Sequence, residues 1–316
     1  MKERKKTMKE EREGRAASVK RRHIKKSQIQ EFLCVVPAVT LVILTIYYPL
    51  ADLVRISFTD WNLLNKNWNY VGLKNWEWFV HNAAGNYFFQ DMWVTLKYTM
   101  MSLMVSLGLG MLLALLMNRI SGGFSVMRAL IFLPKYMAMS TGGVLFVWIF
   151  NKEFGILNII IEKLGGSPVG WLTTAGTALI SVVILTGWHG LGYNMMIYLS
   201  AMMGIPSTYY EAASLDGAGR FQRFRYITLP LLSPTTLFLL VTHFIGSMKI
   251  YNAVDVLTGG GPYRSTEVIV YLIYRLAFTD YRVDRAAVVS IIFFLFLLIV
   301  TLLTMRWSEN KVHYEA

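Results

Sequence analysis

Six long apolar stretches, separated by shorter polar segments, dominate the chain. They cover residues 32–53, 93–118, 130–150, 178–203, 231–251 and 286–305. Each is close to the ~20 residues that a helix needs to cross the hydrocarbon core of a bilayer. The pattern predicts an all-α polytopic membrane protein with six transmembrane helices. Pro134 removes a backbone hydrogen bond from the third stretch, so we expect a bend there.

The same pattern divides the chain into segments. We expect a basic tail at 1–30, a first transmembrane helix with an aromatic outer loop at 31–91, and a core of five helices at 92–306. A polar hairpin at 204–230 interrupts the core, and a short tail occupies 307–316. The apolar run 268–278 is too short to span, so we expect it to lie at the outer interface.

The distribution of Lys and Arg predicts the orientation. Of the 31 basic residues, 12 fall in the tail 1–30, and the connections after the second, fourth and sixth stretches bring that side to 19. Nine fall on the other side, and Lys97, Lys135 and Lys249 lie near helix ends, from which a long side chain reaches the interface. By the positive-inside rule, both termini are predicted to be cytoplasmic, in the plasma membrane of a prokaryote.

Composition excludes several other classes. The net charge of +12 comes largely from the tail, which we expect to lie on anionic lipid headgroups or to stay disordered, and not to bind nucleic acid. The first apolar stretch is longer than a signal peptide core and is expected to remain as a helix. Cys34, the single cysteine, forms no internal disulfide and no cysteine metal cluster. No hydrolase, zinc or phosphate-loop motif occurs, so the chain is not expected to be an enzyme.

The hairpin carries the most specific pattern. Glu211-Ala212-Ala213 is followed after three residues by Gly217, and later by Ile227, Leu229 and Pro230. Thr208, three residues before Glu211, predicts a capping box that starts a short helix, and Gly217 predicts a left-handed residue that ends it. An ordinary interfacial amphipathic helix is the alternative interpretation.

This spacing resembles the EAA signature of ABC importer permeases. Further segments resemble carbohydrate-uptake permeases, including the larger membrane subunit of the maltose transporter: Phe58-Thr59-Asp60-Trp61, Arg128 to Pro134, and the Gly-rich run ending in Pro262. The chain lacks the extra N-terminal helices and the large periplasmic insertion of that subunit. It is closer to plain six-helix sugar permeases.

The resemblance implies an assembly and a coupling site. The expected partners are a second homologous permease, two ABC ATPases that bind ATP and Mg, an extracellular sugar-binding protein and the lipid bilayer; this chain is expected to bind no cofactor itself. The predicted ATPase-coupling residues are Thr208, Glu211, Ala212, Ala213, Leu215, Asp216 and Gly217. Gly260, Gly261 and Pro262 are predicted to form a loop that faces the binding protein.

Two helix faces are candidates for the substrate pathway. They combine hydrogen-bonding groups with small residues at i, i+3, i+4 and i+7 spacing, which suits a sugar. The positions are Thr186, His189, Gly190, Tyr193 and Asn194 on the fourth predicted helix, and His243, Gly246, Ser247 and Ile250 on the fifth. Alternatively, Gly190 and Gly246 serve only to pack helices, with the polar groups bonded across the bundle.

The sequence therefore predicts a permease subunit of an ATP-driven importer for a sugar or oligosaccharide. A permease for glycerol phosphate or another polyol phosphate is the alternative, but a phosphate calls for cavity-facing Lys or Arg, and the basic residues within helices are all near ends. A proton-coupled transporter or a membrane enzyme is disfavoured because no Asp or Glu is predicted in mid-helix.

Overall fold

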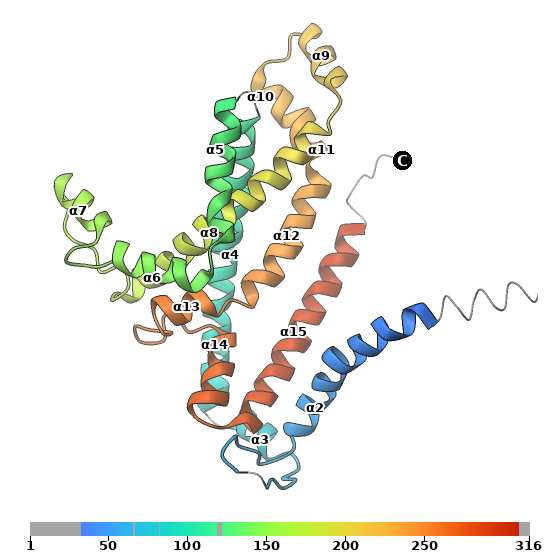
Figure 1. The fold of residues 1–316 in the computed structure, drawn as a ribbon, viewed down its shortest axis with the longest axis vertical. Coiled ribbons are helices and arrows are strands. Elements are labelled where there is room, and N and C mark those ends of the chain that lie inside the picture. Colours follow the sequence, from blue (N-terminus) through green and yellow to red (C-terminus); the bar gives the residue numbers. More distant parts are fainter. Residues whose placement is uncertain (1–32, 66, 82, 119–121, 310–316) are drawn as a thin grey trace, which may run out of the picture. The chain divides into compact units, whose positions relative to one another are not determined.

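A computed structural model describes residues 33–65, 67–81, 83–118 and 122–309. The predicted tail 1–30 and residues 310–316 of the predicted C-terminal tail lie outside this part. The described residues are helical apart from their connections and one isolated bridge between Thr59 and Tyr70 (Figure 1). They form two compact units, which divide between Ile56 and Ser57.

The first unit is a continuous helix from Leu33 to Ile56, long and apolar enough to span a bilayer. Its middle is a π-helical turn, η1 (Ile43–Tyr47), and its last part is α2 (Tyr48–Ile56). Pro49 follows the π turn and has no N–H to donate to the preceding turn, which explains why the helix widens there. Asp52 and Arg55 form an ion pair of 2.7 Å near the end of α2.

The second unit holds the remaining helices. In chain order they are α3 (Lys74–His81), α4 (Ala83–Met117), α5 (Gly122–Phe132), η2 (Leu133–Tyr136), α6 (Met139–Ile149), α7 (Ile156–Lys163), α8 (Ala175–Met203), α9 (Ser207–Leu215), α10 (Arg220–Arg223), η3 (Phe224–Thr228), α11 (Leu229–Leu231), α12 (Ser233–Met248), α13 (Asn252–Leu257), α14 (Ile269–Tyr274), η4 (Arg275–Thr279) and α15 (Val283–Glu309). Helix α4 packs against both α8 and α12.

Four helices in the described part are continuous spans, and two bent pairs raise the number to six if each pair counts as one. The sequence predicted that the third apolar stretch forms one bent helix. It forms two helical segments instead, because the bend after Pro134 is far sharper than expected. Residues 123–136 and 139–149 meet at 103°, with Met137 in an extended conformation between them. The fifth stretch likewise bends by 61° between residues 231 and 233, just before Pro234.

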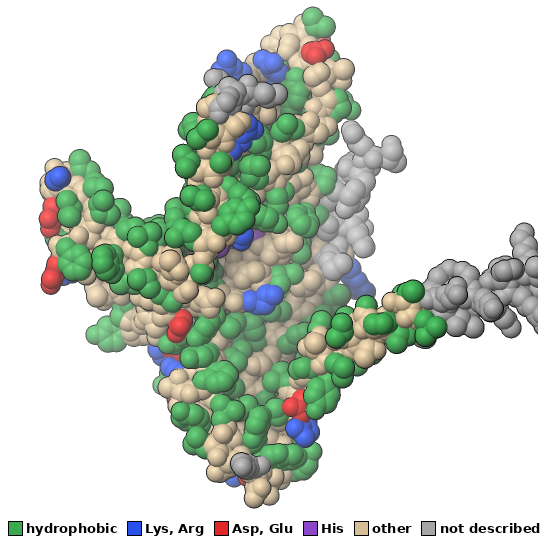
Figure 2. All heavy atoms as spheres, viewed as in Figure 1, with side chains coloured by type: hydrophobic (Ala, Val, Ile, Leu, Met, Phe, Trp, Pro, Cys, Tyr) green, Lys and Arg blue, Asp and Glu red, His purple; other side chains and the backbone are tan. Residues whose placement is uncertain are grey.

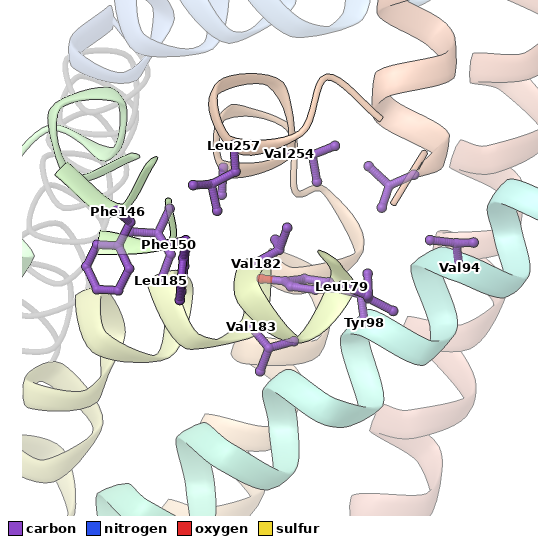
Figure 3. Close-up of a cluster of buried hydrophobic side chains, with 12 residues drawn as sticks. Val94, Tyr98, Phe146, Phe150, Leu179, Val182, Val183, Leu185, Val254 and Leu257 are labelled. Carbon is purple, nitrogen blue, oxygen red and sulfur yellow. The ribbon is translucent and has the colours of Figure 1, made fainter. Parts of the chain in front are cut away.

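Buried side chains gather in three clusters within this unit. Figure 3 shows the first, where side chains from α4, α6, α8 and α13 point toward one another around Tyr98 and Phe150. The second joins α4 and α12 to α14, η4 and α15, and the third joins α4, α8 and α12 around Tyr198. Along α8, residues 179–185 belong to the first cluster and 195–202 to the third. The turns of α8 between these two groups, residues 186–194, contribute no buried side chain to either cluster.

Residues 268–278, predicted to lie at the outer interface, pack against the bundle. Val268 and Ile269 are fully buried, and Leu272, Leu276 and Ala277 pack in the second cluster. Figure 2 shows apolar side chains over much of the middle of this unit, as expected where helices face lipid or another subunit.

Candidate functional site

A cavity of about 300 Å³ opens between α4, η2, α6, α8 and α12. Its lining contains all nine residues that the sequence analysis placed on two helix faces: Thr186, His189, Gly190, Tyr193, Asn194, His243, Gly246, Ser247 and Ile250. On α8 they occupy the turns between the first and third clusters. Five lining residues were missed by the sequence analysis: Tyr98, Ser102, Lys135, Met139 and Thr242. Of these, Tyr98 and Ser102 carry the i, i+4 signal that could have identified them.

Hydrogen bonds fix several polar side chains at the wall of the cavity. The Tyr98 hydroxyl donates to Thr186 Oγ1 at 3.0 Å, and Ser102 Oγ lies 3.0 Å from His243 Nε2. His189 Nε2 lies 3.0 Å from the Met137 carbonyl. Because a carbonyl only accepts, that nitrogen is the donor in this contact.

The glycines of this region fall into two kinds. A Cβ atom at Gly192 would lie 2.3 Å from the Ile131 carbonyl oxygen, so this glycine allows close packing of α8 on α5. A Cβ at Gly190 or Gly246 would meet no heavy atom within 4 Å. Within the described chain these two positions face open space, so they pack no described helices together. The other half of the alternative agrees with the structure, because Thr186, Asn194 and His243 bond across the bundle to α4.

Lys135 changes the electrostatics expected of the cavity. The sequence analysis assigned it to a helix end from which it would reach the interface, but the sharp bend after Pro134 turns it to the cavity wall. Its Nζ lies 5.4 Å from the centre of the Tyr193 ring, within range of a cation–π interaction. None of the described residues that line the cavity is acidic, so its fixed charge is positive.

Asn194 lines the cavity from a more buried position than its neighbours. It is 2% exposed, and its amide lies 3.5 Å from the Ser106 carbonyl on α4. A Cβ at Gly110 would come within 2.9 Å of the Asn194 side chain. Asn194 therefore also holds α8 close to α4, a structural role that the sequence analysis did not assign.

The hairpin begins differently from the prediction. Helix α9 has Pro206 as its N-cap and no side-chain capping bond, so the predicted capping box between Thr208 and Glu211 is absent. Thr208 lies one residue inside the helix, because Pro206 fixes the backbone that starts it. Both side chains are exposed and available to a partner.

The predicted end of the helix is confirmed. Gly217 has φ +76°, a left-handed conformation that costs a residue with a Cβ. The Ala218 N–H donates to the Ala213 carbonyl at 2.8 Å, and the Gly217 N–H donates to Ser214 at 3.2 Å. These two bonds form a Schellman motif, which stops α9 and turns the chain back.

Side-chain hydrogen bonds join α9 to the segment that follows it, α10 and η3. Tyr210 and Thr228 hydroxyls lie 3.0 Å apart, and Arg223 donates to Ser214 Oγ at 3.0 Å. Leu215 at the tip remains 90% exposed. This exposure leaves the Leu215 side chain accessible to another protein.

The loop between α13 and α14, predicted to lie outside, is held by its own hydrogen bonds. Thr266 Oγ1 donates to the Gly261 carbonyl at 2.7 Å and lies 2.7 Å from Thr258 Oγ1. Gly260 has φ +81°, and a Cβ there would come within 3.0 Å of the Tyr271 ring. The predicted binding-protein loop is thus a defined turn, and it contains the cis peptide bond Gly261–Pro262.

A buried group of charges lies directly beneath this loop. Arg264 Nη2 contacts Asp91 of α4 at 2.6 Å and its Nε contacts Glu267 at 3.2 Å, while Arg275 Nη1 contacts Glu267 at 2.9 Å. Burial raises the pKa of the Glu267 carboxyl, and the guanidinium groups of Arg275 and Arg264 oppose that effect. Asp91 was expected outside a helix, but α4 begins ten residues earlier than the predicted span, so this carboxylate lies within it. Asp91 lies four residues from the start of the span Tyr87–Met117 and is paired with Arg264, so it is not a central carboxylate.

Among the residues that the structure describes, no group of three His, Cys, Asp or Glu side chains is placed to hold a metal ion. The features to be explained are the cavity, the hairpin and the loop between α13 and α14.

Comparison with known proteins assigns the family. Residues 106–314 match the family model described as binding-protein-dependent transport system inner membrane component. The chain belongs to this family. It is a non-catalytic permease subunit of a binding-protein-dependent ABC importer and a multi-pass inner membrane protein.

Relatives of this permease match it over nearly their whole length. It is 30% identical over 291 residues to the probable ABC transporter permease protein YurN of Bacillus subtilis, covering 91% of this chain and 98% of that one. It is 29% identical to the sn-glycerol-3-phosphate transport system permease protein UgpA of Agrobacterium fabrum, covering 91% and 97%. A bacterial ABC transporter involved in alginate import shares the fold, with a TM-score of 0.80, 23% identity and coverage of 91% and 98%.

Proposed function

We propose that this permease forms half of the translocation pathway of an importer for a carbohydrate or a carbohydrate derivative, with the cavity as its contact with cargo. The single observation that carries the proposal is that one cavity is lined by all nine predicted residues from α8, α12 and the segment after it, and eight of the nine are polar or glycine. A volume of about 300 Å³ is at the lower end of the ~300–1,000 Å³ typical of ligand sites. It suits one sugar ring, and the partner permease would enclose the rest.

The proposed assembly has a second homologous permease, two ABC ATPases that bind ATP and Mg, and an extracellular binding protein. The hairpin would enter a groove on one ATPase with Leu215 as the inserted side chain. Closure of the ATPase dimer would then move α9. The bonds from Tyr210 to Thr228 and from Arg223 to Ser214 would transmit this movement to the first arm of the bent pair, residues 220–231, and so to α12. Both termini would be cytoplasmic, in agreement with the distribution of Lys and Arg.

A second candidate cargo is an anionic one, a polyol phosphate or an acidic sugar. Lys135 favours it, because an ammonium group in a cavity without described carboxylates attracts an anion. The relative from Agrobacterium fabrum carries the name of a sn-glycerol-3-phosphate system. A neutral cargo was predicted because no Lys or Arg was expected to face the cavity. Lys135 lines the cavity, so that reason no longer holds.

Reconstitution tests both candidates. The complete importer is reconstituted in proteoliposomes with its binding protein. ATP-dependent uptake is then measured separately for a neutral oligosaccharide, for sn-glycerol-3-phosphate and for an oligouronate. ATP-dependent uptake of none of the three, from a complex that hydrolyses ATP, would contradict a carbohydrate-class cargo.

The variants Lys135→Gln and Lys135→Arg separate the two cargo classes. A hydrogen bond to a charged group contributes ~1.5–3 kcal/mol, so loss of the charge should lower uptake of an anionic cargo at subsaturating concentration by roughly tenfold or more. Lys135→Arg should retain most of the uptake. Uptake of a neutral cargo should change by less than about twofold in Lys135→Gln. A change this small for the importer's own cargo would reject the anionic alternative.

A further inference from the structure

Two residues stand out by exposure among the large apolar and aromatic side chains of the described chain. Tyr263 is 93% exposed and Leu215 is 90% exposed, more than any other in that class. Leu215 sits beside the left-handed Gly217 at the tip of the hairpin. Tyr263 sits on the turn that follows Pro262, in the loop between α13 and α14.

The backbone at Tyr263 is unusual for residues with side chains. Tyr263 has φ +51° and Arg264 has φ +60°, so two successive non-glycine residues adopt the left-handed region. This conformation is unfavourable for an L-residue and persists only where surrounding contacts impose it. Such outliers are concentrated at functional sites.

The contacts that hold this backbone conformation are made by Arg264. Its guanidinium is paired with Asp91 of α4 and with Glu267, and it lies 4.1 Å from the centre of the Tyr87 ring. Asp91 is fully buried and Glu267 is 2% exposed, so Arg264 is anchored in the bundle. While Arg264 points inward, the adjacent Tyr263 is turned outward.

The position in the chain determines which side Tyr263 faces. One candidate span, the bent pair of residues 220–231 and 233–248, separates Leu215 from Tyr263. If the bent pair crosses once, the two side chains lie on opposite sides of the membrane. Transport in this family depends on a binding protein, which must dock on the side away from the ATPases.

We propose that Tyr263 is the anchor residue of this permease for its extracellular binding protein, and that Arg264 is the positioning residue that presents it. The proposal rests on the proposed function, since it requires the assembled importer. A tyrosine offers a large amphipathic contact area, and its pre-ordered backbone reduces the entropy lost on docking. Aromatic side chains of this kind dominate binding at many protein interfaces.

The test measures how much binding protein the importer needs. The full complex in nanodiscs is titrated with its substrate-loaded binding protein, and ATP hydrolysis gives the half-saturating concentration and the maximum. Tyr263→Ala should raise the half-saturating concentration by tenfold or more and leave the maximum within about twofold. Tyr263→Phe should fall between wild type and Tyr263→Ala.

Tyr281→Ala is the matched control. Tyr281 is also an outer tyrosine with positive φ, +52°, and it is 43% exposed. It should leave the half-saturating concentration unchanged. An equal rise in both alanine variants would overturn the assignment to Tyr263, as would no rise in Tyr263→Ala.

A double-mutant comparison tests the positioning role. Arg264→Gln should raise the half-saturating concentration, but adding it to Tyr263→Ala should cause little further rise, because the anchor is already missing. Additive effects would contradict the positioning role and leave Arg264 as a general structural contact.

A photo-crosslinking amino acid in place of Tyr263 identifies the occupant directly. Crosslinks to the binding protein support the anchor, and crosslinks to lipid alone overturn it in favour of an aromatic residue at the membrane interface. Failure of the proposed function is distinguishable, because the wild-type complex would then still be stimulated by its binding protein but would take up none of the carbohydrate-class cargoes. Failure of this inference alone would leave wild type and Tyr263→Ala equally stimulated.

Discussion

Substitution of individual glycines around α8 and α12 tests whether the cavity is a pathway or a packing defect. Gly246 and Gly190 face open space, whereas Gly192 faces backbone atoms. The three positions share a helical backbone, so the same change, glycine to alanine, isolates the effect of surroundings. We expect Gly246→Ala to fold as well as wild type and Gly192→Ala to be destabilised.

The structure provides the magnitudes. A Cβ at Gly192 would lie 2.3 Å from the Ile131 carbonyl oxygen and 2.6 Å from Phe132 Cα, so backbone at the end of α5 would have to move. Such overpacking costs ~1–3 kcal/mol. At Gly246 no atom lies within 4 Å, and alanine has up to ~1 kcal/mol better helix propensity than glycine.

The assay for stability is the apparent melting temperature of the purified complex. At ~2–4 °C per kcal/mol for a chain approaching this size, Gly192→Ala should melt roughly 2–12 °C lower, with Gly246→Ala at or above wild type. A drop at Gly246→Ala equal to that at Gly192→Ala would refute the cavity interpretation. It would indicate that the partner permease packs on Gly246.

A larger side chain at the same position tests transport. Gly246→Leu places four carbon atoms in a cavity of about 300 Å³, roughly twice the ~150 Å³ that accepts a benzene ring. We expect complex assembly to be retained and uptake to fall at least tenfold. Wild-type uptake by this variant would place the pathway elsewhere.

The remaining predictions concern the hairpin and the topology. Gly217→Pro should abolish stimulation of ATP hydrolysis by the binding protein without preventing membrane insertion, since proline cannot adopt φ +76°, whereas Gly219→Ala should be tolerated because its Cβ would meet only Gln222 Oε1 at 3.7 Å. Leu215→Asp should weaken ATPase binding by tenfold or more in pull-down assays, and unchanged binding would exclude Leu215 from the interface. In a Cys34→Ser background, an impermeant thiol reagent applied to intact cells should label Tyr263→Cys but not Leu215→Cys, and the reverse pattern would invert the topology.

The sequence alone determined the membrane class, the family and the two helix faces of the cavity. These features depend on local patterns: runs of about 20 apolar residues, and polar residues at helical spacing around His189 and His243. A residue's face on a straight helix is fixed by its position in the sequence. Gly217 was predictable for the same reason, because the need for positive φ is local.

Only the tertiary structure decided what happens where helices bend or meet. Pro134 signals a bend, but the 103° angle and the turning of Lys135 into the cavity depend on packing against α8. The capping box failed because Pro206, two residues before Thr208, already starts the helix. Gly192 and Gly246 look alike in the sequence, and the pairing of Asp91 with Arg264 joins residues 173 positions apart. Contacts between distant segments are set by the packing of the whole bundle, which local periodicity does not encode.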